Sequence, residues 1–332
     1  MTERHQHDSL PLPGLDGSNP LAFLAALGTL RTVTAAWPQR EVKMAWAQAR
    51  GRWQPSLTVA SDATNALDPG NVLDALDAQL GQGDEIPALA MADDLTISHD
   101  QFREAAEHAR QHAHDTCDRR WCDFLVAFGS EAHRDAGSKD PIIEDTAFRT
   151  MSGAGHQHFL KFMRHLIEQT TRQHLHKALF ESWRYDDPVA SMTLRWDPVD
   201  DDPYALRWRN PSGDPARNQG GSMWGAYRLA IEGLPLLPTM PTARRVETTG
   251  FAGRGSRDTY WTWPIWTVPV ALETCQSILS SRLVQTAAMS GPEAAHQHDG
   301  WVELAAVGVA ALFRSQRITV GKYRCFTPAR AV

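Results

Sequence analysis

The chain has 332 residues, enough for one large domain or two of ordinary size. Hydrophobic residues make up 42% of it, so it can bury a sizeable core, which excludes a disordered chain. The net charge of −6 excludes a basic coat over the whole surface but leaves local basic patches open.

The four cysteines, Cys117, Cys122, Cys275 and Cys325, are too few and too scattered for a disulfide framework. The first nine residues are polar, and the apolar stretch that follows is interrupted by Arg31, so we expect no secretory leader. No apolar run reaches the roughly 20 residues that span a bilayer. We therefore expect a protein of the bacterial cytoplasm that has no membrane partner.

A turn-rich stretch, LPLPGLDGSNP, leads directly into the apolar run LAFLAALGTLR. Gly14 and Gly17 keep the lead-in irregular, and Asn19 is placed to cap a helix that has Pro20 in its first turn. The run is almost without charge before Arg31, so we expect a helix that is buried on most sides.

Alternating and helical patterns follow in the N-terminal part. We expect two strands, at 41–47 and 52–60, joined across Arg50-Gly51, and then a helix at 68–80 capped by Asp68. A loop with one short strand follows at 81–97, then a polar helix at 100–113 and an apolar helix at 117–129 that ends at Gly129.

The stretch HRDAGSKDP combines glycine, serine, charge and proline, which is typical of a break between structural units. We place a linker at residues 133–140. It divides the chain into a helix and strand subdomain at 10–132 and a second subdomain at 141–332.

The C-terminal part mixes helices and strands without a βαβ rhythm. We expect a long helix at 155–180, a hairpin at 191–210, and a helix within 222–238 that ends near Gly233 or Pro235. Next we expect a strand at 260–269, which Pro264 and Pro269 confine to an edge or bulge. A helix at 272–284 and a final helix, turn and strand over 301–326 complete this part. The pattern predicts an α+β fold of mixed helices and antiparallel strands, as one large or two closely packed subdomains.

Histidine pairs of the form HxH occur five times, but a metal ion needs several such groups to converge. His112, His114, Cys117 and Cys122 are chemically suitable for zinc, yet their spacing is not that of an established finger. If the region is helical, these four side chains cannot meet, so we expect surface histidines and buried cysteines. On the predicted long helix, His158, His165 and His176 would form one stripe, either solvated or part of a site wall.

Aspartates cluster in two proline-bracketed segments, which are more typical of exposed turns than of metal sites. The members are Asp186, Asp187, Asp197, Asp200, Asp201 and Asp202. Gly153 and Gly155 at a helix start could receive a phosphate on free N–H groups. There is no Walker A, Rossmann or G-x-S-x-G motif, so we expect no cofactor.

Basic residues beside aromatic ones recur in the C-terminal half, a combination suited to single-stranded nucleic acid. The candidate phosphate-binding residues are Arg207, Arg209, Arg228, Arg244, Arg245, Arg254, Arg257, Arg314, Arg317, Lys322 and Arg324. The candidate stacking residues are Trp196, Trp208 and Tyr323. The alternative is that Trp and Arg alternate because a strand has one buried and one wet face.

Five segments, in this order, resemble proteins encoded beside type I-G (formerly I-U) CRISPR–Cas genes. They are LPGLDGSNPLAFLAALGTLR, MSGAGHQHFLKFM, LRWDPVDDDPYALRW, MWGAYRLAIEGLPLLPTMP and WTWPIWTVPV. Their order and spacing fit over most of the chain, from residue 10 to about residue 325. The chain departs from the pattern at Tyr227, where a small polar residue would precede Arg228. The resemblance implies a bacterial antiviral role beside a guide-RNA surveillance complex and its helicase-nuclease.

We therefore expect a non-catalytic CRISPR-associated protein that contacts guide RNA, target DNA or a Cas effector subunit. One alternative is a metal-dependent nuclease that uses residues such as His156 or Asp197. The other is a protein–protein adaptor of the helicase-nuclease that makes contact through the tryptophan stretch 260–269.

Overall fold

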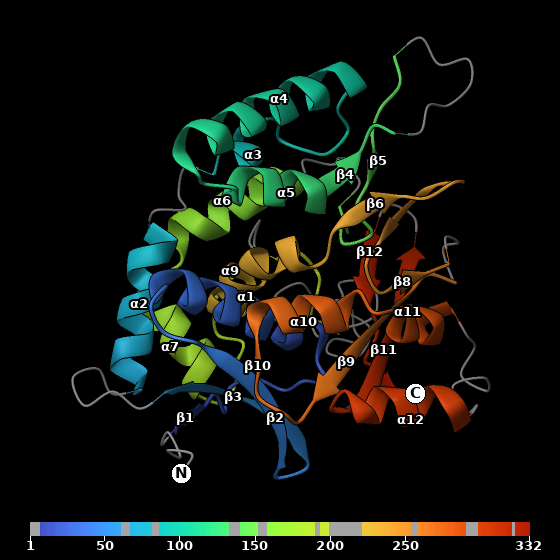
Figure 1. Cartoon of the computed structure of the whole chain (residues 1–332). Helices are drawn as coiled ribbons and strands as arrows, with labels where there is room; N and C mark the ends of the chain where they lie inside the picture. Colours follow the sequence, from blue (N-terminus) through green and yellow to red (C-terminus); the bar gives the residue numbers. More distant parts are fainter. Residues whose placement is uncertain are drawn as a thin grey trace, which may run out of the picture.

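A computed structural model of the chain describes residues 7–60, 67–81, 86–132, 140–151, 158–189, 193–198, 221–253, 258–289, 298–320 and 323–332. Helices pack together with antiparallel sheets, so the expected α+β fold is confirmed (Figure 1). Within the described residues, no helix is both long enough and apolar enough to cross a membrane.

The first sheet has the strand order β1-β3-β2-β10. Its strands are β1 (His7–Pro11), β2 (Lys43–Ala49), β3 (Arg52–Ala60) and β10 (Val270–Ala271). The predicted hairpin between β2 and β3 is confirmed, with both Arg50 (φ 53°) and Gly51 (φ 77°) in the left-handed region that a tight two-residue turn requires. The fourth strand, β10, lies more than 200 residues further along the chain than β3, so this sheet joins distant parts of the sequence.

The second sheet has the order β12-β11-β9-β8, and β13 (Arg330–Ala331) also pairs with β11. Its other strands are β8 (Phe251–Ala252), β9 (Tyr260–Trp266), β11 (Val309–Val320) and β12 (Tyr323–Phe326). Pro264 pairs with Leu312 of β11 and lies beyond the part of β9 that pairs with β8; the register shifts between Val309 and Ala311. The strand as a whole is interior, between β11 and β8, so the predicted edge position is wrong for β9; Pro264 is tolerated because it lies beyond the pairing with β8 and next to the register shift.

The helices α1 (Pro20–Ala36) and α9 (Trp224–Gly233) lie at the centre of the molecule (Figure 1). The Asn19 side chain accepts a hydrogen bond from the Ala22 N–H at 3.0 Å, which confirms the predicted cap. A Cβ atom added at Gly28 would lie 1.7 Å from the Leu229 carbonyl oxygen, and one added at Gly233 would lie 2.5 Å from that of Leu24. Both glycines are therefore needed for the two helix backbones to touch.

Hydrogen bonds from three separate elements hold the lead-in before α1. The N–H of Gly14 donates to the Leu179 carbonyl at 2.8 Å, and that of Gly17 donates to the Trp53 carbonyl at 2.7 Å. The Trp263 indole N–H donates to the carbonyl of Gly17 at 2.8 Å. The turn-rich sequence thus serves packing, because it fits between these neighbours.

The remaining helices surround this centre, and two short two-stranded sheets lie beside them. The helices are α2 (Pro69–Gly81), α3 (Pro87–Ala90), α4 (His99–Thr116), α5 (Arg120–Phe128), α6 (Phe159–Gln169), α7 (Arg172–Phe180), the 3-10 turn η4 (Leu234–Leu236), α10 (Leu272–Leu279), α11 (Arg282–Met289) and α12 (His298–Ala306). The sheets pair β4 (Gly129–Ser130) with β5 (Glu144–Asp145) and β6 (Thr239–Pro241) with β7 (Val246–Thr248).

Several sequence predictions need correction. The described part of 81–97 holds the short helix α3 and no strand, because Pro87 sits in a helical first turn. The predicted single helix 155–180 is two helices that meet at Thr170-Thr171, where Thr171 and His174 form a capping box. One histidine stripe along a continuous helix is therefore wrong. The predicted helix 272–284 likewise breaks at Ser280-Ser281.

Tryptophans form much of the core. Trp46, Trp261, Trp263 and Trp266 surround Phe23 of α1, with ring centroids 5.7 to 6.3 Å from it. Elements on both sides of the predicted linker contribute to the same hydrophobic core. The linker itself stays a prediction, because residues 133–139 lie outside the described ones.

Candidate anion-binding site

Most of the predicted phosphate-binding surface falls into three groups. Arg207, Trp208, Arg209, Arg254, Arg257 and Lys322 lie outside the described residues, as does the side chain of Tyr323. Arg228, Arg314 and Trp196 are buried. Arg245, Arg317 and Arg324 line one cavity, while Arg244 is exposed in the turn between β6 and β7.

The expected roles of Arg228 and Trp196 are wrong. Arg228 is 2% exposed, donates to the Glu232 carboxylate at 2.8 Å and to the Leu80 carbonyl at 3.2 Å. It lies on α9, which is covered on most sides by the helices packed around it. Trp196 is fully buried, and its indole N–H donates to the Phe148 carbonyl at 2.9 Å. Neither side chain can reach a nucleic acid.

Arg314 also faces the interior. It is 8% exposed, and its Nε–H donates to the Thr262 hydroxyl at 3.1 Å. Burial lowers its pKa. The expected contact between Arg314 and phosphate is therefore wrong, because the side chain is buried.

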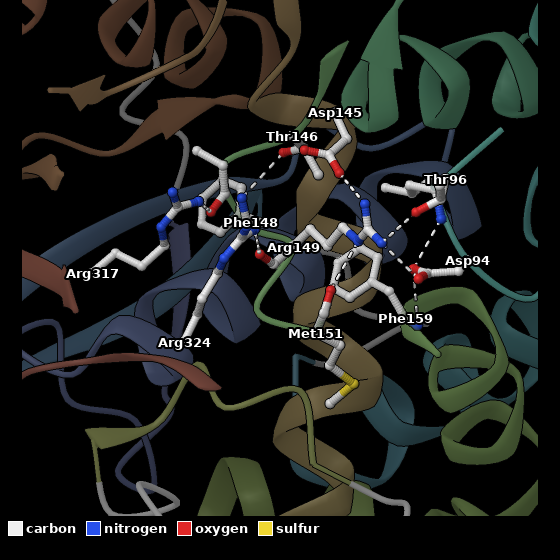
Figure 2. Close-up of polar contacts among 12 residues, drawn as sticks. Asp94, Thr96, Asp145, Thr146, Phe148, Arg149, Met151, Phe159, Arg317 and Arg324 are labelled. Carbon is white, nitrogen blue, oxygen red and sulfur yellow. Dashed lines mark hydrogen bonds and ion pairs between the residues drawn. The ribbon is translucent and has the colours of Figure 1, made fainter. Parts of the chain in front are cut away.

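A cavity of about 390 Å³ lies where β11 and β12 meet the segment that follows β5. Arg317 is paired with Phe326 and Arg324 with Thr319, so the two arginines are diagonal neighbours on the same face of the sheet. Figure 2 shows both guanidiniums reaching toward the chain around Phe148. We call this the Arg317–Arg324 pocket.

Both guanidiniums are held by neutral carbonyl groups. Arg317 donates to the Ala147 carbonyl, and Arg324 donates to the Arg149 carbonyl at 3.2 Å. No carboxylate among the described residues forms an ion pair with either one within 4.0 Å. The Nε–H of Arg317 is buried and has no hydrogen-bond partner within the described ranges. Burial, together with the charge of Arg324, lowers the pKa of Arg317 to about 10.

The carboxylates of the pocket are occupied by other partners. Asp145 pairs with Arg149, and Glu247 pairs with Arg245. Glu144 accepts from the Val246 N–H at 2.9 Å. The pocket therefore keeps two positive groups whose remaining donors suit an anion such as phosphate or carboxylate.

Arg149 is the framework of the site. Besides Asp145, it donates to Asp94 at 2.6 Å and to Thr96 at 2.8 Å, and its Nε–H donates to the Met151 carbonyl at 2.9 Å (Figure 2). These bonds fix the segment whose carbonyls hold the two cavity arginines. Sequence reasoning missed Arg149, because its partners are spread over more than fifty residues and no local motif marks it.

The metal-site alternatives find no support in the part of the chain that the structure describes, where no group of three or more His, Cys, Asp or Glu side chains could hold an ion. Cys117, expected to be buried, is exposed. Asp197 is buried and accepts from the Tyr185 hydroxyl at 3.1 Å. His156 and Asp200 to Asp202 lie outside the described residues.

Two other sequence hypotheses concern a phosphate loop and an adaptor surface. Gly153 and Gly155 lie outside the described residues, and the N–H of Phe159 at the start of α6 already donates to Asp94 at 3.4 Å. The tryptophans of the 260–269 stretch are fully buried, so a protein contact through their side chains is wrong.

No protein-family model matches this sequence, and a search of curated proteins gives no match either.

Proposed function

We propose that this protein is a non-catalytic accessory of a type I-G CRISPR–Cas system in the bacterial cytoplasm, and that it binds guide RNA or target DNA through the Arg317–Arg324 pocket. The observation that carries the proposal is that two guanidiniums converge there on neutral carbonyls and keep their charge for a ligand. The sequence resemblance supplies the biological setting.

The arrangement of the described basic residues favours binding of a few phosphates over binding along an extended surface. A broad surface of arginines and aromatic rings is not present among the described residues, since Arg228, Arg314 and Trp196 are buried. The pocket instead suits one or two phosphates. Each neutralised phosphate of a single strand contributes about −0.7 to the slope of log affinity against log salt, so the slope expected for two phosphates is about −1.4.

The test measures binding of fluorescent single-stranded DNA and RNA across a salt series. The Arg317→Ala/Arg324→Ala variant is expected to weaken binding by about tenfold or more, because two charge-assisted contacts are lost. The matched control, Arg103→Ala/Arg110→Ala, removes the same charge from two exposed arginines of α4 and is expected to change affinity little.

Unchanged affinity in the pocket variant, or a flat salt profile, would overturn nucleic-acid binding at this site. A slope several times steeper would show that basic residues outside the pocket contribute. The same two arginines also suit a carboxylate from a Cas effector subunit. Co-purification that survives nuclease treatment and is lost in the pocket variant would assign the pocket to that protein partner instead.

A further inference from the structure

A second cavity, of about 660 Å³, lies between α1, α5 and α9, and the C-terminal end of α4 also contributes to it. It shares no lining residue with the Arg317–Arg324 pocket. Its volume is in the range of pockets that hold small organic molecules. We call it the Glu232 cavity.

One buried carboxylate organises this cavity. Glu232 is 1% exposed and accepts hydrogen bonds from Arg31 at 2.9 Å, from Arg120 at 2.8 Å and from Arg228 at 2.8 Å. Burial opposes its ionisation, but the three guanidiniums hold the pKa of Glu232 down at about 2. The carboxylate is therefore charged at neutral pH.

The positive charge around Glu232 exceeds the negative charge. Three guanidiniums meet one carboxylate, and the next acid, Asp123, is 3.9 Å from Arg31 and partly solvated. Arg31 and Arg120 both line the cavity, and their side chains keep 14% and 17% exposure. A guanidinium has five N–H donors, so each has donors left for another acceptor.

The lining also has hydrogen-bonding capacity that the described residues do not satisfy. The Nε–H of Arg120, the indole N–H of Trp121 and the hydroxyls of Thr32 and Thr34 are buried and have no partner in the described part of the chain. A purely structural ion-pair network normally satisfies its buried polar groups. The two N–H groups can only donate, so their missing partner is an acceptor, whereas each threonine hydroxyl can pair with a donor or an acceptor.

Apolar side chains complete the wall. Ile86 is buried, and Leu272 and Trp121 are partly buried against the core. We propose that the Glu232 cavity binds a small organic oxyanion: its carboxylate or phosphate lies against Arg31 and Arg120, and its apolar body lies against Trp121 and Leu272. This site is independent of the proposed nucleic-acid site.

Calorimetric titration with three matched probes tests the proposal: benzoate, phenyl phosphate and the neutral benzamide. The protein carries Arg317→Ala and Arg324→Ala in every titration, so the first pocket cannot contribute. Benzoate or phenyl phosphate is expected to bind at millimolar concentration or below, and benzamide is expected to bind at least about tenfold more weakly. Whichever anion binds tighter identifies the oxyanion.

Two variants locate the site. Arg31→Met and Arg120→Met each leave Glu232 with two guanidinium partners, and each is expected to weaken the anionic probe by about tenfold or more. The control Arg103→Met removes one charge from an arginine of α4 that is 49% exposed and does not line the cavity, and is expected to have little effect. Circular dichroism checks that each variant folds.

Three results would overturn the proposal and leave the cluster as a structural network. They are no heat of binding for either anion, equal binding of benzamide, or equal affinity in the Arg31→Met, Arg120→Met and Arg103→Met proteins. The nucleic-acid experiment tests only the proposed function, and the probe titrations test only the Glu232 cavity. The two outcomes stay distinguishable because every probe is titrated into the Arg317→Ala/Arg324→Ala protein.

Discussion

Arg317 and Arg120 both extend to a cavity wall, yet their partners differ in charge. Arg317 donates to the neutral carbonyl of Ala147, whereas Arg120 donates to the buried carboxylate of Glu232. A carbonyl orients a guanidinium and leaves its net charge in place, while a carboxylate neutralises part of it and ties separate helices together. Removal of a carbonyl-held arginine should therefore affect ligand binding, and removal of the carboxylate should affect stability.

The largest effect is expected for Glu232→Gln. The change removes the charged partner of the buried Arg228 and of the half-buried Arg31 and Arg120, so it is expected to lower the free energy of unfolding by about 3–5 kcal/mol. Urea unfolding followed by circular dichroism measures the loss.

The matched control is Glu247→Gln, which breaks the more exposed pair with Arg245 and is expected to cost less than about 1 kcal/mol. Equal losses in the two variants would contradict the distinction between a structural carboxylate and a peripheral one.

The next effect is the pH dependence of the stability that Glu232 contributes. The pKa of Glu232 is about 2 in the folded chain against 4.5 ordinarily, and an acid with a depressed pKa stabilises the fold above its unfolded pKa. Its contribution, roughly 3 kcal/mol, is complete above about pH 4.5 and is lost as the pH falls toward 2.

The difference in unfolding free energy between the wild type and Glu232→Gln should therefore shrink as the pH falls from 4.5 to 2. Urea titrations of both proteins at several pH values measure it, because the other acids cancel in the difference. A difference that stays constant over this range would show that Glu232 is not held ionised.

The smallest effect on stability is expected for Arg317→Met. The variant loses one hydrogen bond to a carbonyl but also removes a desolvated charge that has no ion-pair partner among the described residues, so unfolding free energy is expected to change by less than about 1 kcal/mol. Nucleic-acid affinity should fall nonetheless. A large loss of stability would place Arg317 with the structural arginines.

The local signals in the sequence predict much of the fold. Asn19 and Pro20 mark the start of α1, and Arg50-Gly51 marks the hairpin, because each acts on its own neighbours. The break at Thr170-Thr171 escapes prediction since no glycine or proline signals it. Its capping box uses His174, where the recognised pattern has Glu or Gln.

The sites are much less predictable than the elements. Arg317 and Arg324 stand among eleven basic candidates, and only the register of β11 against β12 shows that they share a face. Arg228 is buried beside Glu232, four residues further along α9, and Arg31 and Arg120 complete the cluster from 201 and 112 residues away from Glu232. Such long-range pairings leave no periodic signal in the sequence.

The contact between Gly28 and Gly233 reaches beyond packing. Arg31 follows Gly28 by about one helical turn, and Glu232 directly precedes Gly233. The close approach of the two helix backbones therefore fixes the distance over which Arg31 and Glu232 form their hydrogen bond. A single methyl group at either glycine would push the two helices apart. A substitution at Gly28 or Gly233 would thus disturb the hydrogen bond between Arg31 and Glu232, and with it the charge balance of the Glu232 cluster.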